Sequence, residues 1–252
     1  MTYYNSNGEK REYTNLKPFD SGDCGQLFSY DNDKLLKIYF ERTHKDNRIK
    51  QYVYEVAKEM NNSHLINISE LLYNEKPNDL DTQIVQAYTC EYIKKDDVDI
   101  LTTPTEYLLE NIHELDKIFK YFTSKKIVVD DVKPANTILQ KDKIVLIDID
   151  CFRKVSYEDY ILSYINEQTI PTLLEGIFLE CYAKHNIQNI KEASKFEIAI
   201  HDLFWYINSL PEENRIKTID ELFKKYKYPV DAIKVYQKNR VIDYNTFKVH
   251  TK

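Results

Sequence analysis

Asp131-Val132-Lys133-Pro134-Ala135-Asn136 is the stretch of sequence that decides the fold, together with the aspartate that ends the next apolar run, Ile144-Val145-Leu146-Ile147-Asp148. Transfer of a phosphoryl group needs a carboxylate to orient the attacking hydroxyl and a cation on the phosphate that moves. It also needs an amide and a carboxylate that together hold Mg²⁺. The two stretches supply these four groups in that order, as Asp131, Lys133, Asn136 and Asp148.

The same two stretches resemble motifs of the eukaryotic-like serine/threonine protein kinases. DVKPAN is similar to the DLKPxN catalytic loop of that family, and Asp148-Ile149-Asp150 is similar to its DFG motif. The resemblance implies that Asp131 is the catalytic base and that Lys133 contacts the moving phosphate. It further implies that Asn136 and Asp148 are the ligands of Mg²⁺ and that ATP is the phosphoryl donor.

Upstream of these motifs, two glycines lie in one loop, although the whole chain has only 4 glycines. Gly22 and Gly25 resemble the second and third glycines of the loop that covers the phosphates in the kinase family, with Asp20 in place of the first. A β-hairpin is predicted over residues 26–40. Lys37, in its second strand, resembles the lysine that holds the α- and β-phosphates of ATP.

Apolar residues recur at helical spacing from Ile49 to Met60 and predict one amphipathic helix. In the kinase family this helix presents a glutamate to the phosphate-binding lysine. Glu55 has the family spacing, so the resemblance implies a pair between Glu55 and Lys37. Glu59 lies slightly nearer the apolar stripe of the helix and is the alternative partner.

Two further strands are predicted over residues 65–72 and 84–93. The segment Tyr88-Thr89-Cys90-Glu91-Tyr92-Ile93 at the end of the second resembles the hinge between the two lobes of a kinase. The resemblance implies that Cys90 is the gatekeeper residue. It also implies that the backbone of Glu91 and Tyr92 faces adenine.

Helices dominate the rest of the chain. Thr103-Pro104-Thr105-Glu106 has the pattern of a capping box and predicts a helix that continues to about Ser124. Short buried strands are predicted at 127–129 and 144–147, and helices after about residue 156. The resemblance covers residues 22–148 and implies an α+β, bilobal fold. An N-lobe (1–89) would hold the antiparallel sheet and one helix, a hinge would follow (90–97), and the C-lobe (98–252) would be mostly helical.

Several positions depart from the kinase pattern. Val129 and Asp130 stand where the common HRD motif has histidine and arginine, and Asp150 replaces the glycine of DFG. Asp148 is the preferred metal ligand, since it ends the strand, and Asp150 is the second. No APE motif follows, although that segment builds the platform for peptide substrates. Asp202 vaguely resembles the aspartate of the central C-lobe helix, but it lies further along the chain than expected, which favours an aspartate on a helix surface.

Three functions remain open at this point. Lys133-Pro134 is typical of serine/threonine protein kinases and makes an active protein kinase, with a protein substrate, the preferred hypothesis. Asp148-Ile149-Asp150 and the missing peptide platform favour a small-molecule kinase of the aminoglycoside or choline kinase type. The lost histidine and arginine favour a pseudokinase that binds nucleotide without turnover.

Composition narrows the range of partners. The formal net charge of −6 disfavours nonspecific binding of nucleic acid, whose affinity comes mostly from lysine and arginine. Apolar runs are all shorter than the roughly 20 residues that span a bilayer, and the N-terminus has no hydrophobic segment of a signal peptide. We therefore expect a cytoplasmic protein with neither nucleic-acid nor membrane partners.

Overall fold

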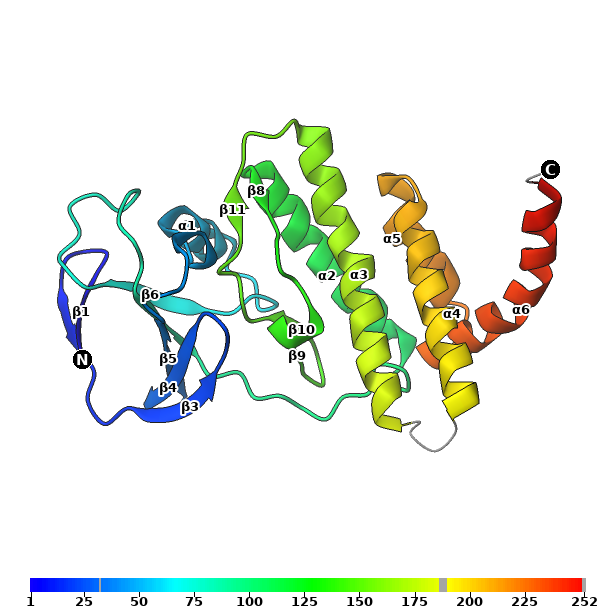
Figure 1. The fold of residues 1–252 in the computed structure, drawn as a ribbon, viewed down its shortest axis with the longest axis horizontal. Coiled ribbons are helices and arrows are strands. Elements are labelled where there is room, and N and C mark those ends of the chain that lie inside the picture. Colours follow the sequence, from blue (N-terminus) through cyan, green and yellow to red (C-terminus); the bar gives the residue numbers. More distant parts are fainter. Residues whose placement is uncertain (32, 186–189, 251–252) are drawn as a thin grey trace.

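The computed structural model describes residues 1–31, 33–185 and 190–250. It is an α+β structure in which a seven-stranded antiparallel sheet and helix α1 (Gln51–Met60) occupy one end of the molecule. The remaining helices pack together at the other end (Figure 1). The loop Asp131–Asn136 and the short strands around it lie between the two ends.

The strand order in the sheet is β2-β1-β6-β7-β5-β4-β3. The strands are β1 (Thr2–Asn5), β2 (Lys10–Glu12), β3 (Lys17–Ser21), β4 (Gly25–Asp31), β5 (Lys34–Tyr39), β6 (Ile68–Tyr73) and β7 (Ala87–Glu91). The predicted hairpin is confirmed as β4 and β5, and the two later predicted strands as β6 and β7. Strands β1 to β3 lie outside the predicted elements, because they are short and mostly exposed and carry little alternation of polar and apolar residues.

Helix α1 is confirmed where its periodicity predicts it. It buries Val53 and Tyr54 against the sheet, and it ends at Asn61, which adopts a left-handed conformation with φ 46°. Asparagine tolerates this conformation better than most residues, and its backbone N–H caps the helix by donating to Ala57 O at 3.1 Å. A 3-10 turn, η1 (Lys45–Asn47), precedes the helix.

Five helices form the other end of the described chain. They are α2 (Thr105–Ser124), α3 (Asp159–His185), α4 (Ile190–Ser209), α5 (Glu212–Phe223) and α6 (Pro229–His250). Helix α2 starts where the sequence predicts it, but the predicted capping box does not form. Pro104 occupies the cap position, and the Thr103 hydroxyl donates to Asp99 O at 2.8 Å instead of capping the helix. The Thr103 hydroxyl thus forms its hydrogen bond within the turn at Asp99 and does not cap α2.

Helix α3 runs through the centre of the helical end and contacts α2, α4 and α5. It also contacts the 3-10 turn η2 (Pro134–Asn136), where a Cβ added to Gly176 would lie 2.6 Å from Pro134 Cγ. Only glycine permits this close approach, which holds the segment carrying Asn136 against α3. The short strands predicted at 127–129 and 144–147 appear as β8 (Ile127–Val128) and β10 (Ile144–Leu146). Strand β9 (Thr137–Leu139) pairs with β10, and β11 (Arg153–Lys154), which was not predicted, pairs with β8.

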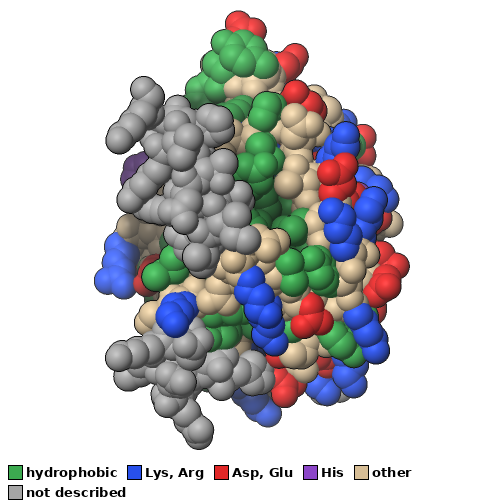
Figure 2. All heavy atoms as spheres, turned by 90° about the vertical axis from the view of Figure 1, so that its right-hand side faces the viewer, with side chains coloured by type: hydrophobic (Ala, Val, Ile, Leu, Met, Phe, Trp, Pro, Cys, Tyr) green, Lys and Arg blue, Asp and Glu red, His purple; other side chains and the backbone are tan. Residues whose placement is uncertain are grey.

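Figure 2 views the molecule from its helical end, where lysine, arginine and acidic side chains are interspersed around a strip of hydrophobic ones. Helix α4 contributes several of the exposed large hydrophobic residues of the described chain, namely Ile198, Trp205 and Tyr206. None of the helices in the described ranges is long and apolar enough to cross a membrane.

Candidate functional site

A cavity of about 600 Å³ lies between strands β3–β5 of the sheet and the loop Asp131–Asn136. Its volume suits a small-molecule ligand, since such pockets commonly measure about 300–1,000 Å³. Its lining brings together all the predicted site residues except Glu55: Gly22, Gly25, Lys37, Glu91, Tyr92, Asp131, Lys133, Asn136 and Asp148.

Gly22 and Gly25 have different structural roles. Gly25 begins β4, and a Cβ at this position would lie 2.5 Å from the carbonyl oxygen of Ile38 on β5. Glycine is therefore required there for the two strands to pair. Gly22 N–H donates to Gly25 O at 3.0 Å and closes a tight turn, while a Cβ on Gly22 would meet no atom within 4 Å. The loop thus leaves open space over the cavity.

Lys37 extends from β5 into the cavity and is only 8% exposed. Its Nζ lies 2.6 Å from Asp150 Oδ2 and 3.1 Å from Asp148 Oδ2, and 5.7 Å from the ring centres of Tyr39 and Tyr88. Burial by itself lowers the pKa of the ammonium, but the two carboxylates outweigh burial and raise the pKa above its usual value. Lys37 is therefore a fixed positive charge in the cavity.

The expected pair between Lys37 and Glu55 is not formed, which corrects that part of the sequence analysis. Glu55 is exposed and accepts a hydrogen bond from Gln51 Nε2 at 2.9 Å. The alternative, Glu59, pairs with Lys125 at 3.2 Å on the surface. Helical geometry explains the outcome, because α1 buries Val53 and directs both glutamates away from the cavity.

Asp131 has a left-handed backbone conformation with φ 56°. Such a conformation is uncommon for a residue with a side chain, and backbone strain of this kind clusters at functional sites. The Asp131 carboxylate accepts hydrogen bonds from Lys133 Nζ at 2.8 and 3.1 Å and from Asn136 Nδ2 at 3.0 Å. Asn136 Nδ2 also donates to Asp131 O at 2.8 Å, so three predicted site residues form one bonded group.

The two aspartates after β10 have different surroundings. The side chain of Asp148 is 32% exposed and lines the cavity, whereas that of Asp150 is 2% exposed and lies behind Lys37. Burial raises the pKa of Asp150 to about 7, although the charge of Lys37 opposes the shift. Asp148 is thus the aspartate that an ion in the cavity can reach.

The residues present fit Mg²⁺ together with a nucleotide. The Asp148 carboxylate and the Asn136 side-chain oxygen are hard oxygen ligands on one wall of the cavity. Within the described residues, no group of three or more His, Cys, Asp or Glu side chains is arranged to hold a metal ion.

The far end of the cavity holds Cys90, Glu91 and Tyr92. The backbone N–H of Glu91 donates to Asn67 O at 3.2 Å, and that of Tyr92 donates to Asp33 O at 2.8 Å. The backbone N–H groups of the two residues expected to face adenine are therefore bound within the protein. At the rim, the ring of Tyr92 packs edge to face on Phe19 at 5.4 Å. Phe19, which the sequence analysis missed, also lines the cavity.

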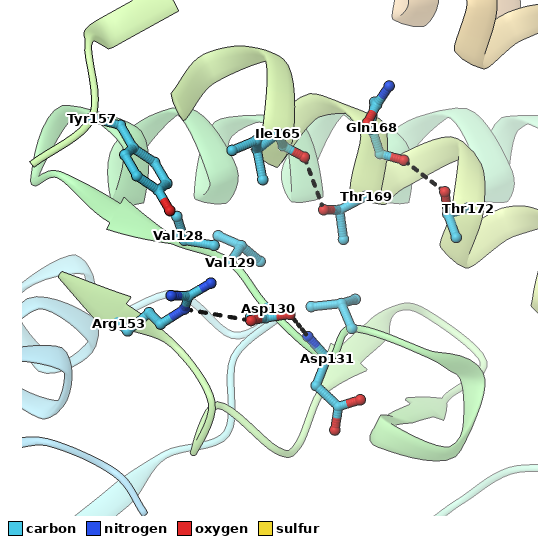
Figure 3. A pocket seen from close by; sticks show the side chains of 11 residues that line it. Val128, Val129, Asp130, Asp131, Arg153, Tyr157, Ile165, Gln168, Thr169 and Thr172 are labelled. Carbon is cyan, nitrogen blue, oxygen red and sulfur yellow. Dashed lines mark hydrogen bonds and ion pairs between the residues drawn. The ribbon is translucent and has the colours of Figure 1, made fainter. Parts of the chain in front are cut away.

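A second hollow, of about 330 Å³, lies beside the first (Figure 3). Asp131 is among the residues that line both hollows. Asp130 forms an ion pair with Arg153 across it, with 3.5 Å between Oδ2 and Nε. One wall comes from α3, through Ile165, Gln168, Thr169 and Thr172.

Asn166 on α3 holds the base of the loop and was not predicted. It is fully buried; its Oδ1 accepts from Val129 N at 2.8 Å, and its Nδ2 donates to Ile127 O at 2.9 Å and to Thr123 Oγ1 at 2.8 Å. Asn166 is thus the residue of α3 that supports the loop, while Asp202, for which a position on a helix surface was favoured, lies half-buried on α4. Its neighbours Glu167, Gln168 and Thr169 are polar as well, so the local sequence does not mark Asn166 as buried.

Lys133 also lines the cavity. Its ammonium is bound to Asp131, and that hydrogen bond is the main reason why the pKa of Lys133 is raised. Two cations, Lys37 and Lys133, therefore face one cavity that also holds the carboxylates of Asp131 and Asp148.

No protein-family model matches the chain, and a search of curated proteins finds no match either.

Proposed function

We propose that this protein is an ATP- and Mg²⁺-dependent phosphotransferase with a bilobal, protein-kinase-like fold, and that it acts as a serine/threonine protein kinase. The observation that carries the proposal is the convergence of distant residues on one cavity. Lys37, Asp131 and Asp148 come from three separate segments, and each lines it. Two cations, two carboxylates and an amide in one cavity match the requirements of phosphoryl transfer.

Each group then has a role. The glycine loop covers the phosphates, and Lys37 binds them as a fixed charge. Asp148 and Asn136 hold Mg²⁺, which supplies neutralisation of the phosphate charge when bound. Asp131 accepts the proton of the attacking hydroxyl. Lys133, at 2.8 Å from Asp131, stabilises the negative charge that develops on the phosphoryl group.

The proposed lobes correspond to the two ends of the molecule. The sheet end, with α1, would form the N-lobe (1–89), and the helical end would form the C-lobe (98–252, within which residues 186–189 and 251–252 lie outside the described ranges). Residues 90–97 would be the hinge, since this segment leaves β7 and leads toward α2. The cavity lies where these parts meet.

A hydroxyl on a protein side chain is the preferred acceptor. Lys133-Pro134 supports this choice, and so does the second hollow, because Asp131 is among the residues that line it. A small-molecule acceptor is the second candidate. Only the residues between Asp148 and the start of α3 at Asp159 are available to build a peptide platform, and the hollow has the size of a small polar molecule.

The test is a transfer assay with γ-labelled ATP and Mg²⁺. Purified wild-type protein is incubated alone, with basic and acidic protein acceptors, and with a panel of aminoglycosides and choline. Label on protein supports a protein kinase, and label on a small molecule alone supports the second candidate. Nucleotide binding without transfer to any acceptor would contradict the enzymatic proposal and indicate a pseudokinase. The Asp131→Asn variant is the negative control.

A further inference from the structure

We infer that Asp150, and not a glutamate of helix α1, is the residue that positions Lys37 for the phosphates of the nucleotide. The inference rests on the proposed function, since it assigns Lys37 to phosphate binding. The geometry that supports it is a single short ion pair. Nζ of Lys37 lies 2.6 Å from Oδ2 of Asp150, and both side chains are buried.

Asp150 is better placed than Asp148 to hold Lys37 throughout the reaction. Asp148 lies 3.1 Å from Lys37 but is one third exposed and lines the cavity, where the metal would bind it. Once Asp148 is engaged by a metal, Asp150 is the carboxylate that stays beside the lysine. A buried ammonium that loses all its partners is strongly destabilised, so a second, enclosed carboxylate keeps Lys37 charged and in place.

The chain around Asp150 holds that carboxylate in position. Ile149 is fully buried, and Phe152 packs edge to face against Phe122 of α2 at 5.2 Å. Phe152 N–H donates to Ile149 O at 3.2 Å and closes the turn that contains Asp150. Two apolar anchors on either side thus attach Asp150 to the helical end of the molecule.

Helix α1 offers no substitute. Glu55 is exposed and bound to Gln51, and Glu59 is bound to Lys125. Lys37 is therefore attached to the segment that follows β10 rather than to α1. It follows that a displacement of α1 would leave the phosphate-binding lysine in place, so a swing of this helix cannot switch the site on and off by breaking the lysine pair.

The pair can be tested without any enzymatic assay by a double-mutant cycle in urea unfolding. Lys37→Met, Asp150→Asn and the double variant are compared, and so are Lys37→Met, Glu55→Gln and their double variant. We expect midpoint shifts that are clearly non-additive for Lys37 with Asp150 and additive for Lys37 with Glu55. Additive shifts for Lys37 with Asp150 would overturn the inference, whether or not the protein proves to be a phosphotransferase.

The positioning role is tested by steady-state kinetics with Mg·ATP. Asp150→Asn should lower kcat/KM for ATP by about tenfold or more, as Lys37→Met does, and Asp150→Glu should recover part of the loss. Glu55→Gln and Glu59→Gln should stay within about twofold of wild type. Loss of folded protein alone would lower the active fraction and leave KM for ATP unchanged, so a raised KM separates positioning from a structural role.

Two results would overturn the inference even if Asp150→Asn failed to fold. One is a loss of about tenfold in Glu55→Gln, whose exposed side chain the fold does not require. The other is an increased Mg²⁺ requirement in Asp150→Glu, which would make Asp150 a metal ligand. A wild-type protein that transfers no phosphoryl group would refute the proposed function instead, and the unfolding cycle would then still decide whether Asp150 holds Lys37.

Discussion

Oδ1 of Asn166 accepts a hydrogen bond at 2.8 Å from the backbone N–H of Val129, two residues before Asp131. This bond joins the central helix α3 directly to the start of the candidate catalytic loop. A protein that positions a carboxylate for proton transfer needs such support, because small displacements of reacting groups reduce rates strongly. Asn166 is therefore a structural support of the site rather than a participant in it.

Replacing Asn166 by alanine should destabilise the protein by about 2–4 kcal/mol. Three hydrogen bonds are lost, and each contributes about 0.5–1.5 kcal/mol, with buried groups left unsatisfied. Urea unfolding measures the change. Thr123→Val, which removes only one of the three partners, should show a clearly smaller effect. A loss below about 1 kcal/mol for Asn166→Ala would show that the loop is held by other contacts.

Asp131→Asn should reduce kcat by about 10²–10⁴-fold and leave ATP affinity nearly unchanged, because a positioned base acts mainly on the transition state. The neighbouring Asp130→Asn is the matched control, since it removes one carboxylate at an adjacent position that pairs with Arg153. Stopped transfer in the first variant and retained transfer in the second would assign the base to Asp131. Wild-type turnover in Asp131→Asn would rule that assignment out.

Lys37→Met and Asp148→Asn should both lose activity, but for different reasons. Lys37 would neutralise phosphate charge, whereas Asp148 is the partly exposed carboxylate that would hold Mg²⁺. Titration with Mg²⁺ distinguishes them, because only Asp148→Asn should need more metal to reach its maximal rate. An unchanged metal requirement in Asp148→Asn would move the metal ligand to Asp150.

The stability of the fold should depend on pH through two buried carboxyl groups whose pKa is raised to about 7, Asp150 and Glu167 on α3, and the part due to Glu167 can be isolated by substitution. Burial raises the pKa of Glu167 to about 7, and a hydrogen bond with Glu212 at the start of α5 adds to the shift. The folded protein therefore keeps a proton that the unfolded chain loses above its usual pKa of 4.5. Because the folded state binds more protons in this window, stability falls as pH rises from about 4.5 to about 7 and levels off above it.

The size of this loss follows from linkage, at about 1.4 kcal/mol for each unit of pKa difference, which gives an expected loss of about 1–3 kcal/mol. Urea unfolding at a series of pH values measures it. Glu167→Gln should reduce the slope of the dependence, leaving the part due to Asp150, and be more stable than wild type above pH 7. Glu213→Gln, on the exposed side of the same α5 turn, is the control and should keep the wild-type profile. A wild-type profile that rises across this window would contradict the assignment.

Local features of the fold were predictable from local signals. The apolar spacing of α1 and α2 reflects which side of each helix is buried, and the polar residues between β4 and β5 mark a hairpin; both signals lie within a few consecutive residues. The loop motif was equally local, since Asp131, Lys133 and Asn136 are bonded to one another within six positions of the chain.

Pairing between distant residues was not predictable in this way. Asp150 lies 113 positions after Lys37, and nothing in its neighbourhood distinguishes it from a second metal ligand. Glu55 was expected at Lys37 by spacing alone, yet the rotation of α1 about its axis depends on how Val53 and Tyr54 pack on the sheet. Such choices are made by tertiary packing, which a single sequence does not reveal.

The segment after Asp148 is held in place without a phosphate group. In kinases that are switched on by phosphorylation, an arginine before the catalytic aspartate pairs with the new phosphate and orders this segment. Here that position is Asp130, and the cation comes from the segment itself, as Arg153 (Figure 3). Strand β11 also pairs with β8, with Arg153 opposite Val128, and Val155 N–H donates to Lys126 O at 2.9 Å.

Activity should therefore not depend on phosphorylation of this segment, although it holds five hydroxyl-bearing residues, Ser156, Tyr157, Tyr160, Ser163 and Tyr164. A phosphate near Asp130 would meet a like charge and would compete for Arg153, so it would loosen the segment rather than order it. The measurement compares initial rates of phosphatase-treated and untreated protein on an external acceptor, and we expect equal rates. The control is a five-site variant with alanine for serine and phenylalanine for tyrosine, which should keep its rate under both treatments. A loss of about tenfold on phosphatase treatment, restored by rephosphorylation at one of the five residues, would show that a switch exists and that Asp130 does not prevent it.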